Sequence, residues 1–325
     1  MHKTKKSTWT VIGIMIVIAL LAPIIVGRKN NYLLNILISY CYFGILASSL
    51  NLLMGYTGQT SLGHAAFMAI GGYTYAILNK TLGIHFLLST VGAILISFAC
   101  GLFIGFACSK LSAIFLSMTT SGFAKAVMLI IINVKWLTGG ANGFTGIPKL
   151  TILGYKITNF ELYYLALAIA LLVFLFCYRL IYSKTGRAMQ AIRNAPIAAA
   201  AMGINVNGYK FLVCGISAAL AGLAGCIYAV NMNYLSADMF NKTSITLLTM
   251  TVCGGMGSLF GPVIGTLVIG TLPELLRPFS EYLDGVYGVM IILVMLFMPK
   301  GIYGGIHSLI KKINKKKKNT VVQEV

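Results

Sequence analysis

Residues 86 to 108 read FLLSTVGAILISFACGLFIGFAC, and none of these 23 side chains is charged. A helix rises about 1.5 Å per residue, so about 20 residues cross the roughly 30 Å hydrocarbon core of a bilayer. The run is continuously apolar and does not alternate, as the strands of a membrane barrel do. It therefore predicts a transmembrane helix.

Similar runs recur along the 325 residues and predict an all-α, polytopic transmembrane helix bundle. The composition agrees, because 58% of the residues are hydrophobic and 10% are charged. In a typical soluble domain about a quarter of all residues are charged, and these residues cover much of its surface. Candidate spans cover residues 9–26, 32–56, 64–79, 86–108, 111–133, 161–182, 210–230, 243–256, 261–276 and 285–298. Three of them (64–79, 243–256 and 261–276) are short enough to be re-entrant or broken helices, so we expect roughly eight to ten spans.

The charge distribution predicts the orientation in the membrane. The chain has 25 Lys and Arg against 6 Asp and Glu, a net charge of +19. A basic surface for nucleic acid is not indicated, because these charges lie between apolar runs. With both termini cytoplasmic, about twice as many basic residues fall inside as outside, which the positive-inside rule favours. We expect one transmembrane domain over residues 1–310, facing the lipid bilayer, and a basic cytoplasmic tail over 311–325.

Two segments are too long and polar to be simple connections between helices. Residues 134–160 contain five glycines and predict an ordered external loop. Residues 183–209 are cytoplasmic in the same topology. They predict a basic helical turn, a restart at Pro196, a short alanine-rich helix and a stop at Gly203. A helix lying across the cytoplasmic face would suit the docking of another protein.

Polar residues gather at two glycine-rich interruptions of the apolar pattern. The first contains Gly58, Gln59, Ser61, Gly63 and His64, which either pack against neighbouring helices or line a translocation path. The second spans 254–265, where Gly257, Gly261 and Gly265 recur at every fourth residue and predict a bare face for helix packing.

Lys125 is the one charge well inside a predicted span. Its ammonium group either reaches toward the outer interface or faces the lumen.

Residues for catalysis or ion coupling are scarce. No Asp or Glu lies deep in a span, which argues against a proton- or sodium-coupled carrier. There is no G-x-x-x-x-G-K-[ST] loop for ATP phosphates and no candidate acid–base constellation, so we expect neither an enzyme nor a bound cofactor. The seven cysteines lie mostly in apolar runs and indicate buried thiols without a disulfide framework or metal site.

Several motifs together resemble the branched-chain amino-acid permeases of ATP-binding-cassette (ABC) transporters, specifically the LivM-type subunit. They are residues 50–67 (LNLLMGYTGQTSLGHAAF), 137–140 with 143–148, 186–188 with 191–193, 201–205 and 254–262. They occur in the expected order between about residues 35 and 303.

The resemblance implies an ABC importer in the bacterial plasma membrane. A LivM-type chain would pair with a LivH-like permease, two cytoplasmic ABC ATPases would supply the energy from ATP, and an extracytoplasmic binding protein would deliver leucine, isoleucine or valine. The segment that couples to the ATPase would include Gly186, Arg187, Ala191, Ile192, Arg193, Ala200 and Gly203. A stand-alone ion-coupled carrier or channel remains the alternative.

Overall fold

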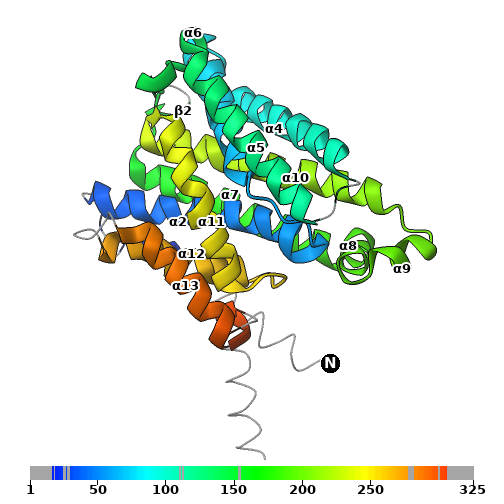
Figure 1. The fold of residues 1–325 in the computed structure, drawn as a ribbon. Coiled ribbons are helices and arrows are strands. Elements are labelled where there is room, and N and C mark those ends of the chain that lie inside the picture. Colours follow the sequence, from blue (N-terminus) through cyan, green and yellow to red (C-terminus); the bar gives the residue numbers. More distant parts are fainter. Residues whose placement is uncertain are drawn as a thin grey trace, which may run out of the picture.

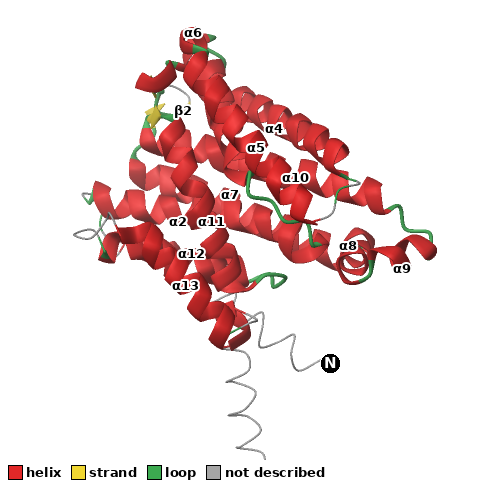
Figure 2. Ribbon diagram, viewed as in Figure 1, coloured by secondary structure: helices red, strands yellow, loops and turns green. Residues whose placement is uncertain are grey.

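The computed structural model of the protein describes residues 17, 19–24, 27, 30–109, 111, 113–152, 155–276, 282–298 and 301–305. Within them the all-α prediction is confirmed, since the strands are only two residues long each (Figure 2). Most of the predicted first span (9–26) and all of the predicted tail (311–325) lie outside the described residues.

Five of the described helices are long and apolar enough to cross a membrane. They are α2 (Asn31–Asn51) with its π-helical continuation Leu52–Tyr56, α4 (Phe86–Cys108), α5 (Ala113–Asn133), α7 (Asn159–Tyr182) and α10 (Val206–Met232). The other predicted spans are shorter or more polar. They are α3 (His64–Ala76) with the π-helix Ile77–Thr81, α11 (Ala237–Gly255), α12 (Gly261–Leu275) and α13 (Leu283–Phe297). The multi-pass prediction therefore holds, and these four helices decide the number of spans.

The core forms where α10 packs against α2, α3 and α4. Glycines allow the backbones to approach closely there. A Cβ atom on Gly71 would overlap the backbone of Gly222, and one on Gly225 would overlap the carbonyl oxygen of Met68. Small residues at such contacts let membrane helices gain dispersion energy where lipid offers no hydrophobic driving force.

Helix α7 connects two structured ends of the molecule. At the end that precedes α7, the chain forms α6 (Lys135–Thr138), a 3-10 turn (Gly140–Asn142) and three short strands, β1 (Phe144–Thr145), β2 (Thr151–Ile152) and β3 (Tyr155–Lys156). Strand β1 pairs antiparallel with β4 (Tyr234–Leu235), which directly follows α10, and β2 pairs with β3. The described residues of 134–160 thus form turns and short strands, and the external position of this segment stays a prediction.

The end that follows α7 carries α8 (Lys184–Asn194) and α9 (Pro196–Ala201), which leads into α10. Helices α7 and α10 are 24 and 27 residues long, so they separate the two ends by about 36–40 Å. Figure 1 shows α6 and β2 at one extremity and α9 at another, beyond α8. The restart at Pro196 is confirmed, since Pro196 is the first residue of α9.

Candidate functional site

The first glycine-rich interruption separates α2 from α3. The chain leaves the π-helix at Thr57, and Gly58 then adopts the left-handed conformation (φ 70°), which glycine tolerates best. Of the five predicted path residues only Gly58 is exposed, while Gln59, Ser61, Gly63 and His64 are buried. The segment packs against α5, where the backbone N–H of Leu62 donates to Thr120 Oγ1 over 3.1 Å.

His64 begins α3 and lies in a small buried polar cluster. Its Nε2 is 2.7 Å from Ser49 Oγ and 3.4 Å from Ser217 Oγ. Both hydroxyl groups donate elsewhere, Ser49 to the carbonyl oxygen of Leu46 and Ser217 to that of Ser49. His64 Nε2 thus shares hydrogen bonds with two serine hydroxyls that also lie within reach of backbone carbonyl oxygens.

Three buried polar atoms of this segment have no hydrogen-bond partner among the described residues. They are Gln59 Nε2, Ser61 Oγ and His64 Nδ1. A buried polar atom without a partner costs free energy, and native proteins usually satisfy it with protein groups, water or a ligand. The three atoms lie within six consecutive residues, so this segment offers unused hydrogen-bonding capacity for water or a polar solute.

The second interruption lies between α11 and α12 and contacts the first one directly. The side chain of Asn51 joins them, because its Nδ2 donates to the carbonyl oxygen of Ser258 and its Oδ1 accepts from the N–H of Gly257, both over 2.8 Å. Gly55 faces the same point, and a Cβ atom there would lie 2.5 Å from the backbone nitrogen of Gly257. Two segments about 200 residues apart in sequence are thus held together.

Arg193, at the end of α8, reaches the same contact. Its Nη1 donates a hydrogen bond to the carbonyl oxygen of Gly55. A Cβ atom on Gly58 would lie 3.3 Å from Arg193 Cγ, and one on Gly257 would overlap the guanidinium group. We refer to Asn51, Gly55, Gly58, Arg193 and Gly257 as the Arg193 junction. It connects α8 with both glycine-rich interruptions.

The other predicted coupling residues lie on α8 and α9. Helix α8 begins at the N-cap Ser183, whose hydroxyl accepts from the N–H of Gly186. Gly186 and Ile192 are buried against the bundle, Ala191 is half-buried, and Arg187 is exposed.

Helix α9 carries exposed apolar side chains. Ile197 is 87% exposed, and Met202, the residue that follows the helix, is 83% exposed. Ala200 is exposed on α9, and Gly203 follows it. Gly203 has a φ of 80°, and the N–H groups of Gly203 and Ile204 bond to the carbonyl oxygens of Ala200 and Ala199. This is a Schellman ending, so the predicted stop at Gly203 is confirmed.

The structure separates the three glycines that were predicted to share one helix face. Gly257 lies in the turn before α12, with a φ of 77°. Gly261 and Gly265 belong to α12 and contact α11, where added Cβ atoms would overlap the carbonyl oxygens of Gly255 and Met250. Only Gly261 and Gly265 therefore share a helix face. Gly257 does not, because α12 begins four residues later, at Gly261.

The sequence interpretation did not include Asn51, Thr120, Ser49 or Ser217 as site residues. Asn51 is 3% exposed at the end of an apolar span. A buried amide in such a position is a signal for a specific partner, since an unpaired amide is costly there. The serines and Thr120 carry no comparable signal, because single hydroxyl groups in membrane helices often bond to their own backbone.

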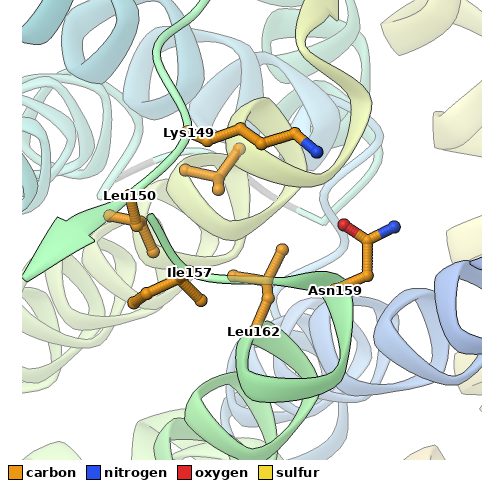
Figure 3. A pocket seen from close by; sticks show the side chains of 6 residues that line it. Lys149, Leu150, Ile157, Asn159 and Leu162 are labelled. Atoms are coloured by element: carbon orange, nitrogen blue, oxygen red, sulfur yellow. The ribbon is translucent and has the colours of Figure 1, made fainter. Parts of the chain in front are cut away.

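A small pocket lies at the opposite end of the molecule, where the 134–160 loop meets α7 and α10. The apolar side chains of Leu150, Ile157 and Leu162 converge there, with Lys149 and Asn159 beside them (Figure 3). The pocket is lined mainly by residues that pack the loop onto the helices. Within the described part of the chain, no group of three His, Cys, Asp or Glu residues could hold a metal ion.

Comparisons with known proteins agree with the sequence motifs. The family described as "Branched-chain amino acid transport system / permease component" matches residues 32–295. The high-affinity branched-chain amino acid transport permease LivM of Escherichia coli strain K12 is 31% identical over 313 residues, covering 89% of this chain and 73% of LivM. The probable LivM of Methanocaldococcus jannaschii is 23% identical, with coverage of 82% and 92%.

A second type of permease in such systems is also related. LivH of Salmonella typhimurium is 29% identical over 188 residues, covering 57% of this chain and 58% of LivH. No solved structure is similar enough to count as a match. Together with the motifs and the multi-pass helical fold, these likenesses show that the chain belongs to the branched-chain amino acid transport permease family.

Proposed function

We propose that this chain is the LivM-like permease subunit of an ABC importer for branched-chain amino acids. It forms the translocation path with a LivH-like subunit, and two cytoplasmic ABC ATPases drive transport. An extracytoplasmic binding protein delivers leucine, isoleucine or valine. The chain itself binds no cofactor and hydrolyses no ATP. Identity to LivM over most of both chains supports this role, and the similarity to LivH supports a second permease of related fold.

The Arg193 junction is the observation that carries the mechanism. The exposed apolar side chains of Ile197 and Met202 offer a docking surface for the ATPase. Helix α9 follows α8 directly. Arg193 of α8 donates a hydrogen bond to the carbonyl oxygen of Gly55, and the side chain of Asn51 accepts one from the N–H of Gly257. A displacement of α8 and α9 is therefore transmitted to both glycine-rich interruptions at once. Such interruptions are where packed helices can rearrange between two discrete states.

The first interruption contributes to the path in the state in which the packed helices have rearranged. Its buried and unpartnered Gln59 Nε2, Ser61 Oγ and His64 Nδ1 can pair with water or with the polar groups of an amino acid once the helices separate. His64 Nδ1 is available for such a bond, because only Nε2 of this ring contacts Ser49 and Ser217.

The orientation follows from the two structured ends. We place the 134–160 loop outside, facing the binding protein, and α8 with α9 in the cytoplasm, facing the ATPases. Both termini then lie in the cytoplasm of a bacterial cell, as the excess of basic residues favours.

Reconstitution into proteoliposomes tests the proposal. The chain with the second permease, both ATPases, the binding protein and ATP should accumulate radiolabelled leucine against its gradient. Omission of any one component, or replacement of ATP by a non-hydrolysable analogue, should abolish accumulation. Uphill uptake by this chain alone, driven by a proton or sodium gradient, would overturn the proposal in favour of a stand-alone carrier.

A further inference from the structure

Helix α5 presents a lysine on its outer face, in the middle of its length. The apolar stretch of this helix runs from Phe115 to Asn133, and Lys125 lies about 15 Å from its first residue and about 12 Å from its last. Lys125 is exposed. The opposite face of α5 packs against the bundle, with Thr120 bonded to the N–H of Leu62 and Phe123 in ring contact with Phe67 at 5.3 Å.

The exposed faces of two other long helices, α4 and α7, differ from this one. On α4 the exposed side chains are apolar throughout, among them Leu88, Leu95, Phe103 and Phe106. On α7 they are apolar from Ala168 to Phe176, and Arg179 appears only in the last turn. These faces suit contact with lipid, whereas an ammonium group at mid-span does not.

Lys125 has no partner within the described part of the chain, since none of those residues forms an ion pair or hydrogen bond with it. Its four-carbon stem is too short to bring the charge to either end of the helix. The space beside it is open, because Gly122, one turn earlier on the same face, has nothing within 4 Å of an added Cβ atom. The outer face of α5 therefore has room for a group that neutralises the ammonium.

We propose that Lys125 binds the carboxylate of the transported solute, so that the outer face of α5 forms one wall of the translocation path. This inference rests on the proposed function, which makes the solute an amino acid. A carboxylate supplies the opposite charge and several acceptor positions for an ammonium group. The remainder of the solute would lie beside Gly122, where the helix has no side chain.

Equilibrium binding tests this inference independently of transport. The complex of both permeases and both ATPases is placed in lipid nanodiscs without nucleotide or binding protein, and radiolabelled leucine is displaced by leucine or by leucinol, which lacks the carboxylate. In the wild type we expect leucine to bind at least about tenfold more tightly than leucinol. Lys125→Gln should remove this preference by weakening only leucine, and Lys125→Arg should retain most of it.

Lys135→Gln, which changes an exposed lysine outside the span, serves as the control and should leave both affinities unchanged. Equal weakening of leucine and leucinol by Lys125→Gln, no change at all, or no leucine binding to the wild type would overturn the inference. Failure of the Gln variant to assemble would also overturn it, since Lys125 would then pair with an acidic group of another subunit. ATP-driven uptake by the wild-type complex is measured separately and reports on the proposed function alone.

Discussion

Gly55 allows the two glycine-rich interruptions to touch, because an added methyl group would overlap Asn51 Oδ1 and the nitrogen of Gly257. Overpacking of this kind costs about 1–3 kcal/mol. We therefore expect Gly55→Ala to lower the midpoint of thermal unfolding in detergent, measured by the loss of the monodisperse chromatography peak. Gly44→Ala on α2, which continues into the π-helix that contains Gly55, is the matched control, because nothing lies within 4 Å of its added Cβ atom. Its stability should be unchanged or higher, and equal losses in both variants would contradict a specific contact at Gly55.

Arg193 is the residue through which α8 reaches both interruptions. Arg193→Ala removes the hydrogen bond to the carbonyl oxygen of Gly55 and leaves α9 in place for docking. We expect leucine uptake per ATP hydrolysed to fall by about tenfold in the reconstituted complex, as the loss of a charge-assisted bond implies. ATP hydrolysis itself should continue. Arg179→Ala in the exposed last turn of α7 is the control, and an equal effect there would show that only basic charge matters.

Among the elements, those with long uncharged runs could be predicted from the sequence almost to the residue. Helix α4 matches the predicted 86–108, and α7 extends the predicted 161–182 by two residues at its start. Helix α11 begins at Ala237, six residues before the predicted start at residue 243. The hydropathy pattern places the start too late because Asp238 and Lys242 make the first turns of the helix polar. Hydropathy reports the apolar part of a helix and does not show where a polar first turn begins.

The Arg193 junction could not be predicted in the same way. The glycines that interrupt the helices are visible in the sequence, but their contacts are not. Arg193 and Gly55 are 138 residues apart, and Gly257 and Asn51 are 206 apart. Neither periodicity nor local propensity contains information about such pairs, which depend on how α2, α8 and the α11–α12 turn pack together.

Helix α9 is the element that we expect to meet the ATPase. Ile197 is 87% exposed, and burying an isoleucine contributes about 1.5–3 kcal/mol to an interface. Ile197→Asp should therefore weaken retention of the ATPases during purification of the complex by roughly tenfold or more. Gln190→Asp adds the same charge to an exposed position of α8 and is the control. Equal loss of the ATPases in both variants would place the docking surface elsewhere or show that charge alone disturbs it.

At the scale of the whole molecule, the two structured ends are fixed to the bundle by different means. Strand β1 pairs with β4, and Tyr73 OH donates to the carbonyl oxygen of Leu235 over 3.1 Å, which ties the loop end to α3 and α10. The α8–α9 end is held by the buried face of α8 and by Arg193. A firmly paired loop end and an opposite end whose α9 is largely exposed suit a body that receives solute at one side and is moved from the other.

That arrangement predicts the sidedness of labelling in intact cells. Ala141→Cys in the loop and Ile197→Cys on α9 both place a thiol at an exposed position, at opposite ends of α7 and α10. A membrane-impermeant maleimide should label Ala141→Cys in intact cells and Ile197→Cys only after permeabilisation. The unmodified chain is the background control, because six of its seven cysteines are buried and Cys100 is half-buried within α4. Labelling of both positions from the same side would contradict the separation of the ends, and the reverse pattern would invert the topology and leave α9 unable to meet a cytoplasmic ATPase.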